Sequence, residues 1–289
     1  MYGIKRVCCT WEVSRSNVYE RIARTRTHKI SAKRGPKSKV TDDKLLELIK
    51  KAIEESPFHG EGYRKIHAKI RAGSTTGIPL RVSRERVLRI MRINGLLSPA
   101  RSPWKPEVPH DGKITTEAPN VMWGTDMTSM VLATGRNAYV FAVVDHCAQD
   151  CIGIHVSDRA TRFEAAEPLR MAVEYVFGTC EEKVALGVYL RHDCGSAYLS
   201  EYFQNEADFL GLESSPSFVR QPEGNGVVER FFRTLKEQLL WLRSFESIEA
   251  LREAVENFVR LYNSCWMVAK HEYRSPLQVR KSFLSQLAA

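Results

Sequence analysis

Apolar residues in the first hundred positions recur every three or four residues, which is the spacing of a helix with one buried face. Residues 41–55 show it most clearly, because Leu45, Leu48 and Ile49 fall on one face. Thr41 and two acids precede them, as is typical of a helix start. The helices predicted from this spacing cover residues 41–55, 63–71 and 83–94.

Beyond residue 119 the pattern changes to alternating or continuous apolar runs, which indicate strands. The first three runs are separated only by short polar turns, so we expect antiparallel neighbours. Later runs alternate with helical stretches, including a helix from Glu167 to Phe177 with Pro168 in its first turn. The succession predicts a mixed α/β layer fold. The predicted strands are 120–133, 137–150, 151–158, 183–193 and 213–220, and the other helices are 199–212, 226–243 and 247–263.

Charge separates the same two halves. The net charge is +9, but residues 1–105 hold 25 Lys and Arg against 9 Asp and Glu, whereas the remainder holds 18 against 25. A basic half with buried helical faces indicates a nucleic-acid-binding region, and its three short helices with a basic last member favour a helix-turn-helix type module. Residues 11–26 are either one more short helix of this kind or the remainder of a longer one, and a solvated basic tail is the alternative for this half.

Prolines mark the boundary between the halves. Residues 98–119 contain five of the twelve prolines, which favours an extended linker. We therefore predict four parts: a basic N-terminal arm over 1–40, a helical DNA-binding domain over 41–97, a linker over 98–118 and an α/β domain over 119–285.

Three further features narrow the class of protein. No run of about 18 apolar residues exists, so no membrane span is expected. The N-terminus lacks the apolar segment of a signal peptide. The seven cysteines are scattered and odd in number, so we expect free thiols in a cytoplasmic, DNA-associated protein.

Three acids stand where strands and helices carry chemistry. Asp126 lies inside the first predicted strand among apolar neighbours, which is costly unless the carboxylate is paired or liganded. Asp193 ends the fourth strand, and Glu229 begins a late helix after a Gly-Asn-Gly turn. Carboxylates are the ligands of hard cations such as Mg²⁺, and two ions about 4 Å apart clamp both oxygens of phosphoryl transfer. We expect these three acids to converge as metal ligands and catalytic residues.

Each acid alone also has a structural interpretation. Asp193 suits a loop-opening turn, and Glu229 suits a first helical turn facing the helix dipole. The set is more specific than its members, because 35 residues separate Asp193 from Glu229. Asp145 is either a fourth ligand or a structural residue, and we favour the structural role. His192 precedes Asp193 on a strand, so it is expected to point to the opposite face and pack.

The stretches WGTDMT, HDCGSAY and PEGNGVVERFFRTLKE, in this order, resemble the motifs of DDE transposases and retroviral-type integrases. They are similar in particular to the second-reading-frame product of bacterial insertion-sequence transposases of the IS-three family. FHGEGYRKIHAKI and VSRERVLRIMRINGLL resemble the helical DNA-binding region of that family, and LYNSCWMVAKHEYRSPLQVR resembles its C-terminal end. The resemblance therefore covers nearly the whole chain.

The resemblance implies an RNase H-like core, a mixed five-stranded sheet with flanking helices, behind a small all-helical DNA-binding region. It implies a transposase that binds the terminal inverted repeats of a mobile element and cleaves and joins DNA strands with Mg²⁺, or Mn²⁺ as a substitute. The expected partners are element ends, target DNA and further copies of the chain. Fusion to an upstream reading frame is left open.

DNA-contact residues are expected in two places. Lys236 matches the basic residue that the family carries seven positions after its glutamate, and Asn225 and Arg233 share its helix face if that helix is regular. In the basic half, a groove-facing helix and two backbone contacts are expected. The residues concerned are Arg84, Arg86, Arg89 and Arg92 for the groove, and Arg64 and Lys65 for the backbone.

One departure from the family leaves a second function open. The family usually has Asn after the second acid, where this chain has Cys194, and a thiol cannot make both hydrogen bonds of an amide. The alternative function is a catalytically inactive DNA-binding relative that represses or competes at element ends. A structure-specific nuclease on the same core is a third hypothesis.

Overall fold

The computed structural model describes residues 3–27, 40–75, 77–98, 116–216 and 225–287. The chain divides into two compact units, Met1–Lys44 and Leu45–Ala289. Most of the predicted linker over 98–118 and the Gly224 of the Gly-Asn-Gly turn lie outside the described residues. Among the described residues, no helix is both long enough and apolar enough to cross a lipid bilayer.

The first unit contains two helices, α1 (Ile4–Thr10) and α2 (Arg15–Thr27). The sequence predicted only the second of them. Cys8 is the buried residue of α1, whereas Trp11, which follows that helix, is 76% exposed. A pair this short buries little apolar surface, so it has only a small core of its own.

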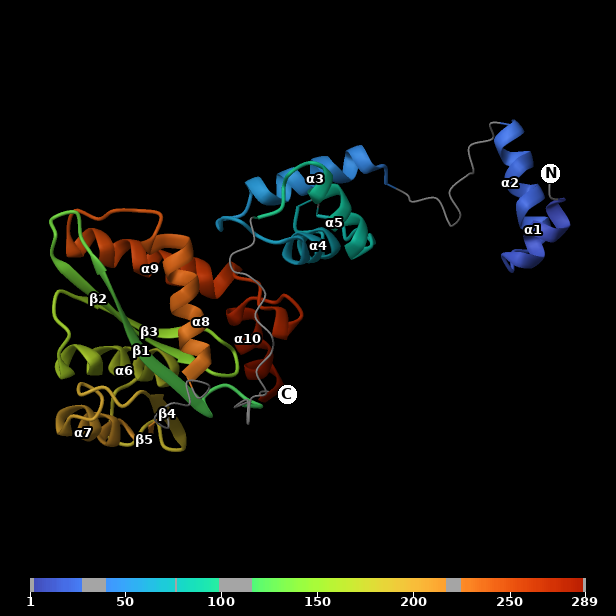
Figure 1. Cartoon of the computed structure of the whole chain (residues 1–289). Helices are drawn as coiled ribbons and strands as arrows, with labels where there is room; N and C mark the ends of the chain where they lie inside the picture. The colour runs from blue at the N-terminus through green and yellow to red at the C-terminus, as the bar shows by residue number, and fades with distance from the viewer. Residues whose placement is uncertain (1–2, 28–39, 76, 99–115, 217–224, 288–289) are drawn as a thin grey trace. The chain divides into compact units, whose positions relative to one another are not determined.

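Three helices form the helical module, and they are the three that the sequence predicted (Figure 1). Thr41 accepts a hydrogen bond from the Lys44 N–H at the start of the first helix, and Ser83 accepts from the Arg86 N–H at the start of the third. Each of the three buries its apolar face, and the buried residues are Leu45, Ile49, Ile66, Val87, Ile90 and Met91. The helices are α3 (Asp42–Glu54), α4 (Tyr63–Ala72) and α5 (Arg84–Ile93).

A five-stranded sheet forms the centre of the second half, with strand order β3-β2-β1-β4-β5. The first three strands pair antiparallel, as their short turns predicted, whereas β4 and β5 continue the sheet parallel to β1. The mixed sheet expected from the sequence is therefore confirmed. The strands are β1 (Met122–Val131), β2 (Asn137–Asp145), β3 (Cys151–Ser157), β4 (Val188–His192) and β5 (Leu212–Pro216).

Helices cover both faces of this sheet (Figure 1). On one face α8 (Gly226–Leu235) and α9 (Ile248–Cys265) pack on Val140, Ala142 and Val144 of β2. On the other face α6 (Arg162–Phe177) and α7 (Glu201–Leu210) pack on Trp123, Phe141 and Leu190. The alternation of side chains along β2 thus supplies both cores.

Three helix predictions need correction. Helix α6 begins at Arg162, where Thr161 caps it, so Pro168 lies inside the helix rather than in its first turn. The helix predicted over 226–243 is α-helical only to Leu235 and continues as a π-helical segment, η2 (Lys236–Leu240). Helix α9 is not the last one, because α10 (Pro276–Leu287) follows it.

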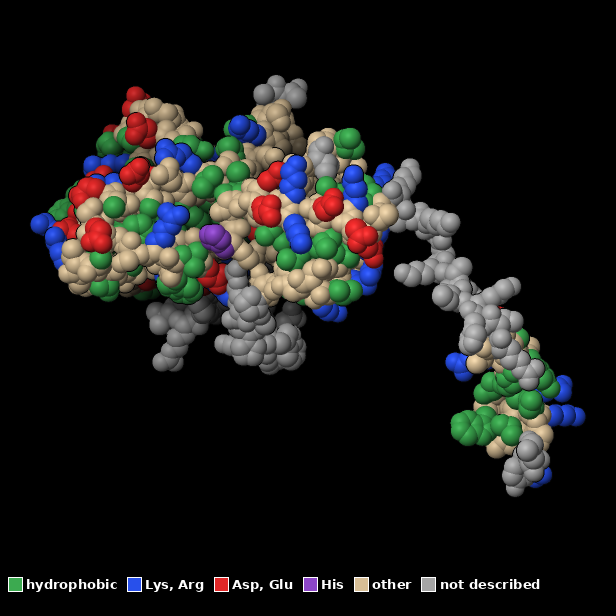
Figure 2. Space-filling view, turned by 90° about the horizontal axis from the view of Figure 1, so that it is seen from above, with side chains coloured by type: hydrophobic (Ala, Val, Ile, Leu, Met, Phe, Trp, Pro, Cys, Tyr) green, Lys and Arg blue, Asp and Glu red, His purple; other side chains and the backbone are tan. Residues whose placement is uncertain are grey.

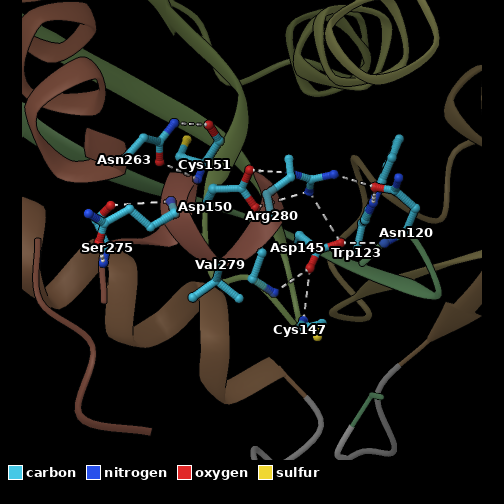
Figure 3. A network of polar contacts seen from close by, with 12 residues as sticks. Asn120, Trp123, Asp145, Cys147, Asp150, Cys151, Asn263, Ser275, Val279 and Arg280 are labelled. Carbon is cyan, nitrogen blue, oxygen red and sulfur yellow. Dashed lines mark hydrogen bonds and ion pairs between the residues drawn. The ribbon is translucent and has the colours of Figure 1, made fainter. Parts of the chain in front are cut away.

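Helix α10 is held by a buried ionic network (Figure 3). The guanidinium of Arg280, which is 5% exposed, donates two hydrogen bonds to Asp150 and one to Asn120, and lies 3.5 Å from the carboxylate of Asp145. Asp145 also accepts backbone N–H groups of Asn120, Cys147 and Ala148. Asp145 therefore serves a structural role, as the sequence favoured.

The loop before α4 joins the helical module to the C-terminal half. The side-chain amide of Gln238, in η2, accepts from the His59 N–H at 2.8 Å and donates to the His59 carbonyl at 3.0 Å. Beside it Phe58 packs edge-on against Phe258 and Trp266. The two parts of the second unit are thus connected by an aromatic core as well as by the chain.

Candidate active site and DNA-contact residues

The parallel pairing of β1 and β4 brings two of the predicted acids together. Gly124 lies opposite Arg191 in this pairing. Asp126 stands two residues further along β1, opposite Ala142, on the face of the sheet that α8 covers. Asp193 directly follows His192, the last residue of β4. The pairing of β1 with β4 therefore brings the segments that carry the first two acids next to each other.

Helix α8 carries Glu229 over the same face. The pKa of Asp126 is raised to about 6, chiefly by burial and also by the charges of Asp193 and Glu229, whereas the Met127 N–H and Lys236 act in the opposite direction. Each of these charges must lie near Asp126 to have this effect. The three predicted acids and the predicted basic residue therefore share one region of the surface.

The three carboxylates differ in exposure. Asp126 is half-buried, whereas Asp193 and Glu229 are exposed. Asp126 Oδ1 accepts the Met127 N–H at 2.8 Å, and Asp193 Oδ1 accepts the Gly195 N–H at 2.9 Å. In the part of the chain that the structure describes, no three His, Cys, Asp or Glu side chains form a ready-made metal cluster. Three oxygen-donor groups of one charge nevertheless suit a hard cation.

Two histidines lie near these acids inside the protein. His192 is fully buried, donates or accepts at Asp193 O and Ser214 Oγ, and stacks on Tyr198, so it packs on the opposite face as predicted. His146 is 3% exposed, and burial lowers its pKa to about 4, which leaves the ring neutral. The sequence analysis assigned no role to His146.

Lys236 lies at the start of η2 beside the second half of β1. It lines a surface groove together with Ser129, Met130, Trp241 and Arg243, and the indole of Trp241 is 69% exposed. Arg233, one turn earlier, is exposed and pairs with Glu237 at 3.0 Å. Their roles as DNA contacts stay predictions, and Trp241 and Arg243 are neighbours that the motif did not single out.

Asn225 is not placed as expected. Its side chain is 5% exposed, and Nδ2 donates to the Thr125 carbonyl at 3.0 Å. Glu229, four residues later, is exposed. The two residues do not share a face because Asn225 precedes the regular helix, with φ −118° and ψ 15°. The side chain of Asn225 is therefore engaged inside the protein rather than presented to DNA.

Lys65 is also placed differently from the prediction. Its Nζ lies 3.0 Å from the centroid of the Trp266 ring and 3.9 Å from Glu61 Oε1. Only 18% of its side chain is exposed. The cation–π contact joins the helical module to Trp266 of the C-terminal half, whereas the ion pair with Glu61 lies within the module. The role of Lys65 as a DNA-backbone contact stays a prediction.

The predicted arginines of the helical module are on its surface. Arg84, Arg89 and Arg92 are exposed, Arg86 is half-buried, and Arg64 is exposed beside Tyr63. Arg64 and Arg84 line one groove with Arg71, His67 and Tyr273, and Glu85 and Glu272 lie at the same groove. Arg71 and Tyr273 were missed by the sequence analysis, because their proximity depends on tertiary contacts. On the face drawn in Figure 2, basic and acidic side chains are interspersed.

Comparison with protein families matches both halves of the chain. Residues 41–104 match an HTH-like domain, and residues 116–222 match an integrase core domain. A second integrase core domain family matches residues 210–265. The helical module and the mixed sheet thus correspond to two separately recognised domains, and the sheet has the integrase-like RNase H fold.

Curated relatives extend the similarity along the chain. The transposase InsD of insertion element IS2A/D/F/H/I/K from Escherichia coli is 29% identical over 280 residues, which cover 92% of this chain and 90% of the relative. The InsD transposase of IS2-9 from strain K12 is also 29% identical, with 92% and 88% covered.

Solved structures similar to the chain are retroviral. An intasome of simian T-cell lymphotropic virus with a PP2A regulatory subunit aligns with a TM-score of 0.48 and 19% identity, covering 76% of this chain and 74% of that one. The HTLV-2 integrase catalytic core with magnesium aligns with a TM-score of 0.43 and 18% identity, covering 57% and 98%. On its domains and curated relatives, the chain joins an HTH-like domain to an integrase core, is homologous to the IS2 transposases, and fits the IS-three family of insertion-sequence transposases.

Proposed function

We propose that this protein binds the ends of a mobile DNA element and catalyses strand cleavage and strand transfer at Asp126, Asp193 and Glu229. The observation that supports the proposal is that the charges of Asp193 and Glu229 both act on Asp126, whose strand β1 pairs with β4, the strand that Asp193 follows. Acids that lie close enough to disfavour one another's charge are expected where a cation is to be held.

The donor set supports Mg²⁺ as the cofactor. All three groups offer carboxylate oxygens, which Mg²⁺ and Mn²⁺ prefer over nitrogen or sulfur. A divalent cation held there supplies electrostatic stabilisation to the attacking and leaving oxygens of phosphoryl transfer. The chain's own part is to fix the carboxylates: backbone N–H groups of Met127 and Gly195 each hold one oxygen of Asp126 and Asp193.

Binding of DNA is assigned to the helical module and to the surface around Lys236. Arg84, Arg89 and Arg92 lie exposed along α5, the third helix, which suits insertion into a groove of duplex DNA. Lys236 lies near Asp126, so it is placed to contact a phosphate next to the strand being cut. A homo-oligomer on DNA is the expected working form, with element ends and target DNA as partners.

A single assay separates the three functions considered. The full chain is incubated with Mg²⁺ and a labelled duplex carrying the terminal repeat that flanks its own gene, together with unlabelled target DNA. Joined product supports a transposase, and cleaved ends without joining indicate a nuclease. Specific retention of the duplex without any cleavage, in Mg²⁺ and in Mn²⁺, indicates the inactive DNA-binding relative.

A further inference from the structure

A group of buried polar side chains lies against β1, the strand that carries Asp126. Asn225 donates through Nδ2 to the carbonyl of Thr125, the residue before Asp126. The two bonded residues are 100 positions apart in sequence. Asn225 also stands at the N-terminal end of α8, four residues before Glu229. This one side chain therefore connects the strand of the first predicted ligand to the helix of the third.

Gly124 shows how closely a second side chain approaches this connection. A Cβ atom at Gly124 would lie 2.6 Å from Asn225 Oδ1 and 2.9 Å from His146 Nε2. Both polar atoms thus lie close to the same point, beside the backbone of β1 at Gly124. Only glycine leaves the space open, because any side chain would collide with both groups. The glycine keeps the imidazole of His146 and the amide of Asn225 close together.

The two side chains have complementary, unused hydrogen-bonding atoms. Both are buried, at 3% and 5% exposure. Among the described residues, Asn225 Oδ1 and the two ring nitrogens of His146 have no hydrogen-bond partner. A buried polar atom left without a partner costs about 1–3 kcal/mol. A neutral imidazole offers one N–H donor, and the amide oxygen is an acceptor.

We infer that His146 donates its Nε2–H toward Asn225 Oδ1, directly or through one water, and that this pair is a positioning device that sets Asp126 against Glu229. Asn225 is then held on both sides of its amide, by Thr125 and by His146. An amide fixed in this way cannot rotate, so the start of α8 keeps one position along β1. The spacing of the two acids, and with it the affinity of the site for a divalent cation, depends on the pair.

The inference rests on the proposed function, and its test measures cation binding separately from catalysis. Binding of Mn²⁺ to the full chain without DNA is measured by electron paramagnetic resonance for wild type, Asn225→Ala, His146→Phe and His146→Gln. Loss of a group that orients a metal ligand commonly weakens metal affinity about 10- to 100-fold. Asn225→Ala and His146→Phe should show such a loss, and His146→Gln, which retains an N–H donor, should recover most of it.

Controls separate positioning from a general loss of structure. Asn205→Ala, at an exposed site of α7, should bind Mn²⁺ like wild type. Nitrogen NMR of His146 at pH 7 should show a neutral ring protonated at Nε2, a readout that is independent of any metal. A charged ring or the Nδ1–H tautomer would overturn the inference, as would wild-type Mn²⁺ affinity in Asn225→Ala. An equal loss in His146→Phe and His146→Gln would assign the effect to packing instead.

Failure of the proposed function has a different signature. Asp126→Asn is measured beside these variants. If Asp126→Asn loses Mn²⁺ binding while Asn225→Ala matches Asn205→Ala, the positioning pair is refuted and the proposed site stands. If Asp126→Asn binds Mn²⁺ and cleaves DNA like wild type, the site itself is refuted.

Discussion

Two groups of acids lie on the same sheet and differ in what balances their charge. Asp145 and Asp150, at the turn between β2 and β3, are fully buried around the guanidinium of Arg280. Asp126 lies within β1, Asp193 directly follows β4 and Glu229 lies on α8, and two of the three are exposed. In the first group, the guanidinium of Arg280 balances the charge of the two carboxylates. The second faces solvent, with the charge of Lys236 nearby.

The comparison shows which of these acids are available to bind a cation. The pKa of both Asp145 and Asp126 is raised to about 6, chiefly by burial and also by neighbouring acids. Arg280 offsets part of this cost for Asp145 through direct ionic contact. A perturbed carboxyl is therefore not by itself a functional one. The presence or absence of an internal guanidinium distinguishes a structural group of acids from a candidate cation site.

The largest difference between the two groups is expected in activity. Asp126→Asn should lower cleavage and joining by about a thousandfold or more, because an electrostatic contribution of several kcal/mol is lost. Its unfolding midpoint should equal or exceed that of wild type, since the substitution removes a half-buried charge that neighbouring acids disfavour. Duplex binding should be nearly intact. Asp158→Asn, at an exposed salt bridge with Arg136, is the control, and near wild-type cleavage by Asp126→Asn would remove it from the site.

A loss of stability rather than of activity is expected for the group of Asp145, Asp150 and Arg280. Arg280→Met should destabilise the chain by about 3–5 kcal/mol, because two buried carboxylates lose their cation. Denaturant unfolding measures the effect. Arg274→Met, at an exposed arginine of the same segment, should change stability by less than about 1 kcal/mol. Equal midpoints for the two variants would show that the network contributes no more than a surface contact.

The dependence of stability on pH is a further test of the group of Asp145, Asp150 and Arg280. The pKa of Asp145 is raised to about 6 in the folded chain and is near 3.9 when unfolded. The folded chain therefore binds this proton more tightly, so the contribution to stability is complete below about pH 4 and is lost as pH rises through about 6. Between pH 4 and pH 7, wild type should lose up to about 3 kcal/mol relative to Asp145→Asn. Parallel stability curves for the two proteins would contradict this.

The smallest effect is expected at Lys236. Lys236→Ala should lower strand joining by about two- to tenfold, because one phosphate contact is lost, and should impair hydrolysis less than Glu229→Gln does. The deficit should shrink at high salt, where phosphate contacts are screened. Lys183→Ala is the matched control, since that lysine pairs with Asp208 on another part of the surface. A joining rate that is equally reduced in both variants would deny Lys236 a special position.

The sequence predicted the parts of the site that depend on residue type and order. Asp126 and Asp193 were selected because a carboxylate inside an apolar strand or at a strand end is unusual, and Glu229 because it stands at the apolar start of a helix after a Gly-Asn-Gly turn. The sheet was predictable because its apolar runs and short turns define the first three strands. Helices α3, α4 and α5 followed from local spacing and capping residues, which act within a few positions of each other.

The parts that escaped prediction depend on long-range packing. Arg280 meets Asp150 across 130 positions, and no local pattern marks either residue as a partner of the other. Asn225 was assigned to DNA by assuming a regular helix, whereas its amide reaches back to β1. The π-helical turn at Lys236 breaks the helical spacing on which face assignments rely. The proximity of His146 to Asn225 follows from the position of both side chains next to Gly124, which no local pattern in the sequence indicates.

The contact between Phe58 and the C-terminal half bears on how this protein can be divided for experiments. The proline-rich segment looks like a place to cut, and a catalytic fragment beginning there would lack Phe58 and Lys65. Phe58 lines a groove together with Leu239, Phe258 and other residues of the other half, and it packs edge-on against Phe258. Without it, that aromatic surface would face water and favour aggregation. A fragment that begins before Pro57 should be easier to keep in solution than one that begins at the linker.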